Sequence, residues 1–504
     1  MKTNRKIKIN INYLYVGAAA LLSSCVNQKQ EKPNIIIMYI DDLDFSELGY
    51  YNSEVMTPCI DSLARNGLIF NNYYASSPLS SPSRYSALTG KYASFSSSFN
   101  GQPSDEPVYI RWNADIRENQ DKTIAQYLKP LGYKTGFVGK WHNGQPIEED
   151  DLLDTDPTRP DLNEYLADVY KQHVDYVQKS SGFDYVASLY GNNLHVTGLP
   201  VIMQYHNMEW ITEGAVKFIE DNKKQPFFLW FATTVPHLPD PNLSINADPK
   251  ITPSGILDKA IDIQAARNII LPRIQESGKN PKYSAMLWLD DAIQAVINKL
   301  KEHNLFENTI IIFASDNGDD KGKMTCYEAA GKLPAFVYWK GKIKPGYLDD
   351  LVSNIDFLPT VLDFCDANSN TEDLCGLSWK NTLLNGESVP RSSLYIEVVY
   401  QRAVLTKDWK YIITRFPSYI QKDISSKNRK EYSIEGERAP DRYGNENDYP
   451  AYFDDNQLYN LKNDPNEQIN LYGQKKYFIE QQNMRDLMQN YCSKTPFKSG
   501  EFGK

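Results

Sequence analysis

Two runs of consecutive apolar residues constrain the fold of this chain most, because each ends directly in acidic or amide side chains. Residues 34–40 read Asn-Ile-Ile-Ile-Met-Tyr-Ile and are followed by Asp41 and Asp42. Residues 309–314 are similarly apolar, and Ser-Asp-Asn-Gly follows at 315–318. Strands with this composition are buried on both faces, as in parallel sheets covered by helices. Ligands bind at the carboxyl ends of such strands, so we expect these polar side chains to meet in one crevice.

Strand-like and helix-like runs alternate through most of the chain. Further apolar runs at 135–138 and 226–232 are typical of strands. Residues 282–302 carry apolar side chains at helical spacing and predict a long amphipathic helix. Shorter helices are expected at 57–64 and 123–131. The alternation predicts an α/β fold, with a mostly parallel central sheet flanked by helices.

The pattern changes after residue 385, where short β-like runs gather. Three such runs and a final helix are expected at 393–399, 402–405, 409–415 and 476–491. We therefore predict a catalytic domain at 33–385 and a smaller C-terminal subdomain at 386–504, in which an antiparallel sheet packs with one helix. The polar segment 417–452 has little periodicity and is interpreted as an insertion or long loop.

The N-terminus has the pattern of an export signal. A basic start precedes an apolar run at 13–22, which is too short to span a bilayer. The sequence Leu-Ser-Ser-Cys at 22–25 resembles a bacterial lipoprotein box. We expect a lipoprotein signal peptide at 1–24, a lipid on Cys25 and a polar tether at 25–32. The alternative is a conventional signal peptide with an incidental cysteine. The lipid would hold the protein to a membrane of the cell envelope, in the periplasm or at the cell surface.

Charge and cysteine content limit the classes of partner. The chain has 54 Lys and Arg against 64 Asp and Glu, a formal net charge of −10. We expect no nucleic-acid partner, because no basic excess exists to displace counterions. An anionic substrate would need local positive groups instead. Of the cysteines beyond Cys25, Cys365 and Cys375 could pair in an oxidising compartment, or all could stay buried thiols.

One serine-rich segment contains an eleven-residue sequence motif. Residues 80–90 read Ser-Ser-Pro-Ser-Arg-Tyr-Ser-Ala-Leu-Thr-Gly. This run resembles the signature of the type I, formylglycine-dependent sulfatases of the alkaline phosphatase-like superfamily, S/C-x-P-S-R-x-x-x-L-T-G. Other segments match that family in the same order: Asp-Asp at 41–42, Gly-Lys-Trp-His at 139–142, Pro-His at 236–237, Ser-Asp-Asn-Gly at 315–318, Gly-Lys at 322–323, Asn-x-Asp-x-x-Pro-Thr at 354–360 and Asn-Asp-Pro at 463–465. The resemblance covers nearly the whole mature chain.

The resemblance implies a modified nucleophile and a metal. Ser80 would be oxidised after translation to formylglycine (3-oxoalanine) by a Ser-type anaerobic sulfatase-maturating enzyme of the host. Its aldehyde hydrate would attack sulfur and would also bind the metal. The remaining ligands would be Asp41, Asp42, Asp316 and Asn317. Their hard oxygen donors suit Ca²⁺, the usual ion of the family, or Mg²⁺ as the alternative.

The remaining site residues can be assigned roles from the same resemblance. Pro82 suits the first turn of a helix, which would place Ser80 at the positive end of that helix. Arg84 would then lie on the same helix face as Ser80, and it would stabilise the hydrate. Lys140 and Lys323 would bind sulfate oxygens. His237 would protonate the leaving alcohol and His142 would assist release of sulfate as a base. The roles of the two histidines could be exchanged.

Three positions depart from the family pattern. Asp44 and Cys59 replace a usual Gly and Asn, and we expect both to be tolerated because neither position carries chemistry. Lys332 stands where an Arg is common. It keeps the charge but loses the planar two-pronged donor, which puts a substrate role there in doubt.

These observations predict a sulfuric ester hydrolase that removes O-sulfate from a carbohydrate, in glycan degradation at a cell envelope. One alternative is a phosphate-ester hydrolase or phosphotransferase of the same superfamily, which should show more histidine ligands than a chain with six His provides. The other is an inactive glycan-binding lipoprotein, which should have lost some of the site residues. Candidate contacts to sugar are Asn192, Asn193, His195, Tyr205, His206, Asn207 and Arg402.

Overall fold

A computed structural model gives the structure of the chain and describes most of it. The described residues are 32–100, 102, 109–111, 113–145, 152, 155–157, 159–196, 199–318, 322–367, 372–425 and 445–496. The expected signal peptide, Cys25 and all but the last residue of the tether lie outside these ranges. Within them, no helix combines the length and apolar character needed to cross a membrane.

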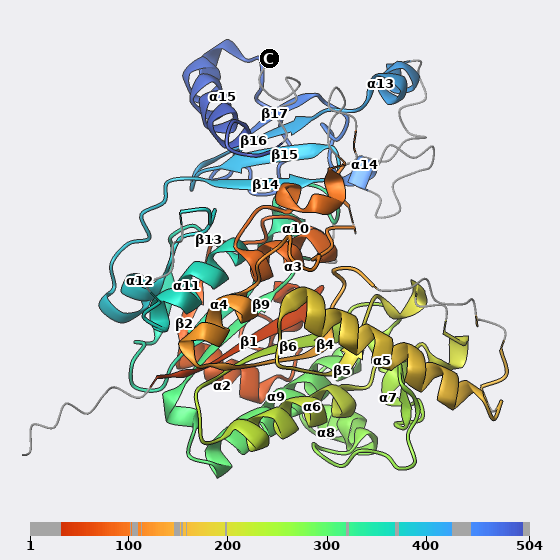
Figure 1. Ribbon diagram of the computed structural model, residues 1–504. Coiled ribbons are helices and arrows are strands. Elements are labelled where there is room, and N and C mark those ends of the chain that lie inside the picture. Colours follow the sequence, from red (N-terminus) through yellow and green to blue (C-terminus); the bar gives the residue numbers. More distant parts are fainter. Residues whose placement is uncertain are drawn as a thin grey trace, which may run out of the picture.

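An eight-stranded sheet forms the centre of the molecule, in the order β12-β2-β11-β9-β1-β6-β4-β5 (Figure 1). Its strands are β1 (Asn34–Asp41), β2 (Leu68–Phe70), β4 (Lys134–Lys140), β5 (Tyr185–Tyr190), β6 (Phe227–Pro236), β9 (Thr309–Ser315), β11 (Ala335–Tyr338) and β12 (Gly346–Leu348). The five strands from β9 to β5 are parallel, whereas β11 runs antiparallel to both its neighbours. The predicted mostly parallel sheet is confirmed.

Helices cover both faces of this sheet, because the side chains of β1 alternate between two cores. Ile35, Ile37 and Tyr39 belong to one core, and the intervening residues belong to the other. The first core is covered by α3 (Ser80–Thr89), α4 (Ile124–Leu128), α11 (Phe357–Phe364) and α12 (Lys380–Asn385). The second is covered by α2 (Pro58–Arg65), α6 (Met208–Asn222), α8 (Ile270–Glu276) and α9 (Ser284–Glu302). Because successive side chains of a strand point to opposite faces, both faces of the sheet are apolar. The sheet therefore lies between two layers of helices, which makes three layers in all.

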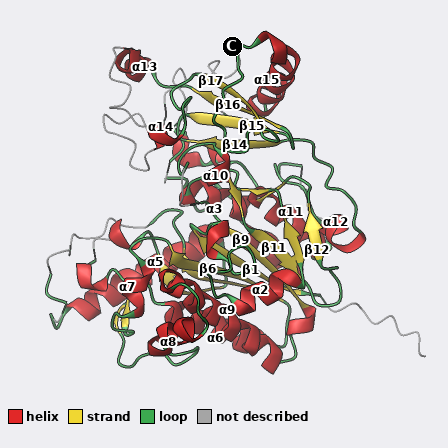
Figure 2. Ribbon diagram, turned by 180° about the vertical axis from the view of Figure 1, so that it is seen from behind, coloured by secondary structure: helices red, strands yellow, loops and turns green. Residues whose placement is uncertain are grey.

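A second sheet lies at one end of the molecule, beyond α3 and α10 (Figure 2). Its four antiparallel strands are β14 (Leu394–Val398), β15 (Gln401–Leu405), β16 (Trp409–Thr414) and β17 (Asn456–Asn460). The helix α15 (Phe478–Cys492) packs against β15 and β16. This confirms the expected C-terminal sheet and helix, while the exact division at 385/386 stays a prediction.

Short elements join the two sheets or surround the strand ends. They are β3 (Tyr73–Tyr74), β7 (Ile251–Thr252), β8 (Gly255–Ile256), β10 (Lys332–Leu333), β13 (Val352–Ser353), α7 (Pro241–Ile245), α10 (Glu328–Gly331), α13 (Ser418–Ser425) and α14 (Asn445–Asp448). The last two fall in the segment expected to be a long loop, so its described parts contain helix. The long helix α5 (Leu162–Ser181) packs against β5, and its Val177 belongs to the first core. Cys365 and Cys375 both carry free thiols and are not joined by a disulfide.

Candidate active site

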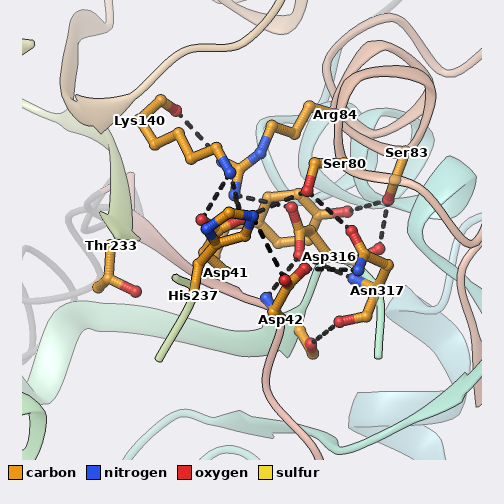
Figure 3. Close-up of polar contacts among 12 residues, drawn as sticks. Asp41, Asp42, Ser80, Ser83, Arg84, Lys140, Thr233, His237, Asp316 and Asn317 are labelled. Carbon is orange, nitrogen blue, oxygen red and sulfur yellow. Dashed lines mark hydrogen bonds and ion pairs between the residues drawn. The ribbon is translucent and has the colours of Figure 1, made fainter. Parts of the chain in front are cut away.

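The carboxyl ends of four parallel strands meet the start of α3 (Figure 3). Asp41 ends β1 and Lys140 ends β4, while Asp316 follows β9 and His237 follows β6. Ser80 is the first residue of α3. The structure therefore brings together segments that lie far apart in the sequence, at the edge of the sheet where ligands bind in open α/β folds.

Ser80 lies at the N-terminus of α3, a position that favours anions. Its Oγ donates a hydrogen bond to Asn317 Oδ1 at 2.9 Å and a longer one to Asp41 Oδ1 at 3.4 Å. The preceding Leu79 provides no side-chain cap, so the first N–H groups of the helix are not satisfied by a cap. Such a helix end attracts negative charge. The predicted helix start around Pro82 agrees with the observed one.

Three buried carboxylates face one another in the same crevice. Oxygen atoms of Asp41, Asp42 and Asp316 lie within 4.8 Å of one another. Asn317 adds its amide, whose Nδ2 donates to Asp42 Oδ1 at 2.6 Å. With the hydroxyl of Ser80, the donor set consists only of oxygens around a buried negative charge. These residues fit a hard divalent cation such as Ca²⁺ or Mg²⁺ and do not resemble a zinc site.

Three buried cations surround these carboxylates. Lys140 Nζ lies 2.8 and 2.6 Å from the two oxygens of Asp41. Arg84 Nη2 contacts Asp41 at 2.9 Å and Asp316 at 2.7 Å, and Lys323 Nζ contacts Asp42. Burial alone would raise the pKa of Asp41, but the charges of Lys140 and Arg84 hold it well below its ordinary value. Three positive side chains in one crevice offset the negative net charge of the chain at this place.

Two histidines stand beside the cations in a neutral state. His237 Nδ1 lies 2.6 Å from the carbonyl oxygen of Leu238, and because a carbonyl only accepts, Nδ1 carries the proton. Its Nε2 lies 3.5 Å from Asp42 Oδ2. Burial and the charge of Lys140 lower the pKa of His237 to about 3. The same two causes lower the pKa of His142 well below its ordinary value, and its Nδ1 has no hydrogen-bond partner among the described residues.

Two asparagines that the sequence analysis gave no role hold parts of this site. Asn354 Nδ2 donates to the Oγ of Ser83 at 2.8 Å and to its carbonyl oxygen at 2.9 Å, while Ser83 Oγ donates to the carbonyl oxygen of Asp316 at 2.6 Å. Asn354 begins one of the matched motifs, which was a usable signal. Asn445 accepts from Gly322 N at 2.6 Å and donates to Lys323 O at 3.0 Å. It lies in the aperiodic segment, where no sequence pattern marked it.

The candidate sugar contacts divide into three groups. The His195 ring stacks on the His237 ring, with centroids 6.0 Å apart and planes 9° apart, so it lies beside the site. By contrast, His206 contacts the carbonyl oxygen of Pro239, Asn207 caps α6 and Arg402 donates to backbone carbonyls, all as buried residues. The polar atoms of these three side chains make hydrogen bonds within the protein. Asn192, Asn193 and Tyr205 are half-buried.

Comparison with known proteins adds an independent line of evidence. A family model described as sulfatase matches residues 33–367. The chain is 28% identical to an arylsulfatase of Hemicentrotus pulcherrimus, over 72% of this chain and 64% of that protein. It is 27% identical to an N-acetylgalactosamine-6-O-sulfatase of Bacteroides thetaiotaomicron, over 90% of this chain and 93% of that protein. A solved structure from work on glycosaminoglycan metabolism by Bacteroides thetaiotaomicron shares the fold, with a TM-score of 0.63, 23% identity, and coverage of 92% of this chain and 100% of that one.

Proposed function

The chain belongs to the sulfatase family, and we propose that it hydrolyses O-sulfate esters of a carbohydrate. One observation carries the proposal: Ser80 lies at the open N-terminus of α3, within a crevice that also holds Lys140, Arg84 and Lys323. A helix end and three cations together suit a sulfate group. The matched bacterial relative is named for removal of a 6-O-sulfate from N-acetylgalactosamine, which supports a sulfated sugar as the substrate class.

Ser80 carries formylglycine in the active enzyme under this proposal, made by a Ser-type anaerobic maturating enzyme of the host. Asp41, Asp42, Asp316 and Asn317 hold Ca²⁺ or Mg²⁺ together with residue 80. When bound, the metal polarises the sulfate and the aldehyde hydrate supplies the attacking hydroxyl. The buried, all-oxygen donor set supports this assignment.

The other side chains bind the anion and move protons. Lys140 and Lys323 each contact a carboxylate through one ammonium group, which has three donors and can therefore also bind a sulfate oxygen. Arg84 spans Asp41 and Asp316 and keeps both oriented. Because His237 Nδ1 donates to Leu238 O, only its Nε2 can give a proton to the leaving alcohol, and Nε2 must first take up that proton. His142 acts as the base for release of sulfate, and an exchange of the two roles is the alternative.

The protein is an exported lipoprotein in this proposal, anchored through Cys25 to a membrane of the cell envelope. The basic start, short apolar run and Leu-Ser-Ser-Cys sequence support it. Metabolic labelling with a palmitate analogue tests the anchor: Cys25→Ser should abolish labelling, and labelling that persists in that variant would contradict it.

The decisive experiment measures both the modification of Ser80, by mass spectrometry, and the rate at which the protein releases sulfate. The chain is expressed with and without a Ser-type maturating enzyme, and the peptide containing Ser80 is weighed. Maturation should remove the mass of two hydrogen atoms. Activity on N-acetylgalactosamine 6-sulfate, N-acetylglucosamine 6-sulfate and 4-O-sulfated chondroitin oligosaccharides should rise in parallel. Ser80→Ala serves as the inactive control.

Two results would contradict this assignment. Full sulfate-ester hydrolysis by protein with unmodified Ser80 would exclude the formylglycine mechanism. Hydrolysis of phosphate monoesters, with no release of sulfate by matured protein, would favour the phosphatase alternative.

A further inference from the structure

One edge of the central sheet carries an excess of lysines. The loops that lead into β1, β2, β4, β5, β6, β9 and β12 lie at this edge, because these strands all run in the same direction. We call their surface the amino face, and its residues are 32–33, 66–67, 129–134, 182–184, 223–226, 301–308 and 339–345. It contains nine Lys and three Asp or Glu, in a chain whose net charge is −10.

Hydrogen bonds join the loops of the amino face to one another. Lys32 Nζ donates to the carbonyl oxygen of Leu131 at 2.7 Å, and Asn308 Nδ2 donates to that of Lys32 at 3.2 Å. Trp339 Nε1 donates to the carbonyl oxygen of Glu307 at 3.2 Å. The loops before β1, β4 and β9 and the loop between β11 and β12 therefore form one connected surface.

The carboxylates of the amino face all have cationic partners. The pairs are Asp184 with Lys129, Glu302 with Lys299, and Glu307 with Lys340. Glu220 and Asp221, at the end of α6 beside this face, are likewise paired, with Lys223 and Lys217. By contrast, six exposed lysines of the face form no ion pair among the described residues: Lys32, Lys134, Lys224, Lys301, Lys342 and Lys344. Their charge is not neutralised within the protein, so it is available to an anionic surface.

The chain leads to its proposed lipid anchor from this same face. Lys32 belongs to the amino face, and Cys25 precedes it by only seven residues. Seven residues reach at most about 25 Å when fully extended, so the membrane that holds the lipid lies within about 25 Å of Lys32. Attraction between exposed charges extends about 8 Å at physiological ionic strength. The tether is therefore long enough for contact with the membrane and too short to let this face move far from it.

The active-site crevice lies at the opposite edge of the sheet. The strand β1 runs from Asn34 at the amino face to Asp41 in the crevice, where it ends beside α3 (Figure 1). At about 3.3 Å per residue, these two ends are about 23 Å apart. A surface that covers the amino face therefore leaves the crevice open.

We infer that the amino face docks on the anionic lipid surface in which the lipid of Cys25 is inserted, an inference that rests on the proposed lipoprotein anchor. Anionic lipids attract basic residues that lie close to them, and a lipid chain together with a basic patch holds a protein more firmly than either alone. The tether alone would let the protein turn, whereas the six unpaired lysines fix its orientation. The crevice then points away from the membrane, towards dissolved glycans. A basic face can also bind an anionic polysaccharide, but the position of the tether favours the lipid surface.

The test measures how fast individual lysines of the lipidated protein are acetylated on vesicles. One set of vesicles contains phosphatidylcholine alone, and the other also contains the anionic phosphatidylglycerol. Mass spectrometry should show that Lys224, Lys342 and Lys344 react at least about threefold more slowly on the anionic vesicles. About 1 M salt should remove this protection, because it screens the attraction.

Substitutions assign the protection to the amino face. A triple variant removes three of its lysines: Lys134→Gln, Lys342→Gln and Lys344→Gln. In this variant, Lys224 should react at nearly equal rates on the two kinds of vesicle. The matched control removes the same charge from exposed lysines of the C-terminal region: Lys462→Gln, Lys475→Gln and Lys476→Gln. It should keep the protection of Lys224, and in the wild-type protein these three control lysines should react equally on both kinds of vesicle.

Each outcome decides the inference. Equal acetylation of the amino face on the two kinds of vesicle, or equal loss of protection in the two triple variants, would overturn the docking. Protection by dissolved chondroitin sulfate, with none on anionic vesicles, would identify a polysaccharide ligand and would also overturn it. If the triple variant does not fold, the wild-type comparison alone still decides. Protein that carries no lipid and attaches to neither kind of vesicle would instead overturn the anchor at Cys25, and the docking with it.

Discussion

At the scale of the residue, the site depends on charges placed where water cannot screen them. Asp41, Asp42 and Asp316 are each at most 2% exposed, so each needs a positive partner inside the crevice. From sequence, Arg84 was expected to stabilise the hydrate of residue 80 and Lys140 to bind sulfate oxygens, and the structure also shows both paired with carboxylates. The same side chains therefore support the site and remain available to an anion.

Lys323→Gln tests the sulfate-binding role of a single ammonium group. Loss of one charged donor to the anion should lower kcat/KM on a sulfated sugar by about 10²–10³-fold. Steady-state kinetics on matured protein measure this change in kcat/KM, and circular dichroism verifies that the variant is folded. Lys342→Gln, an exposed lysine outside the site, is the control and should keep wild-type activity. A loss below threefold in a folded Lys323→Gln protein would remove Lys323 from the sulfate site.

His206 should make stability depend on pH. Its Nε2 lies 2.9 Å from Pro239 O, and burial lowers its pKa to about 4. An unfolded histidine has a pKa of about 6.5, so between these values the unfolded state binds more protons. The stability from neutral His206 is therefore complete above pH 6.5 and is lost as pH falls towards 4, by up to about 3 kcal/mol.

Urea unfolding at several pH values measures this loss. The variant His206→Gln should be less stable at neutral pH and should lose less stability than wild type between pH 6.5 and 4. Parallel pH profiles for the two proteins would show that His206 does not titrate as stated.

At the scale of the element, several predictions from sequence were close to the structure. The apolar runs at 34–40 and 309–314 are β1 and β9, and the amphipathic run at 282–302 is α9. A buried strand appears in the sequence as a continuous run of apolar residues, and an amphipathic helix appears as apolar residues at helical spacing. Both patterns can be recognised from the sequence directly. The prediction was less accurate at the end of α4, where a 3₁₀ turn at Lys129–Leu131 replaces the last turn of the expected helix. The elements that were not predicted include the long helices α5 and α6 and the strand β5.

Asn445, in α14, contacts the segment that carries Lys323, and the sequence of α14 does not indicate this contact. Its amide holds the backbone of Gly322 and Lys323. In Asn445→Ala, loss of both hydrogen bonds should let Lys323 move, and kcat/KM should fall by about tenfold. Because the residue acts through Lys323, the double variant with Lys323→Gln should lose little more than Lys323→Gln alone.

A double-mutant cycle on matured protein measures that coupling. Asn463→Ala, in an exposed turn of the same region, is the control. Additive losses from Asn445→Ala and Lys323→Gln would mean that Asn445 acts by another route.

At the scale of the whole molecule, the C-terminal sheet and the catalytic domain share a buried ionic contact. Lys410 of β16 is fully buried and bridges Glu328 of α10 and Glu467. Burial opposes its charge, but the two carboxylates raise the pKa of Lys410. This contact joins residues on either side of the predicted division at 385/386.

Lys410→Met should destabilise the protein by about 3–5 kcal/mol, because it leaves the buried carboxylate of Glu467 and the partly buried one of Glu328 without their cation. Lys407→Met removes an exposed lysine from the same sheet, whose Nζ lies 3.0 Å from Asp350, and should cost at most about 1 kcal/mol. Urea unfolding measures the free energy of unfolding of both variants. Equal stabilities of the two variants would show that the buried bridge does not hold the C-terminal sheet to the catalytic domain.

From the sequence alone, the sulfatase family and the α/β fold class could be predicted. The apolar strands, the polar residues that end them and the segment at 80–90 are local patterns, and local patterns can be read without knowing which segments touch. The order of the strands in the sheet and the contacts of Asn445 are visible only in the folded molecule. These depend on how segments up to several hundred residues apart pack, and polar loops carry no periodic signal that reveals their neighbours.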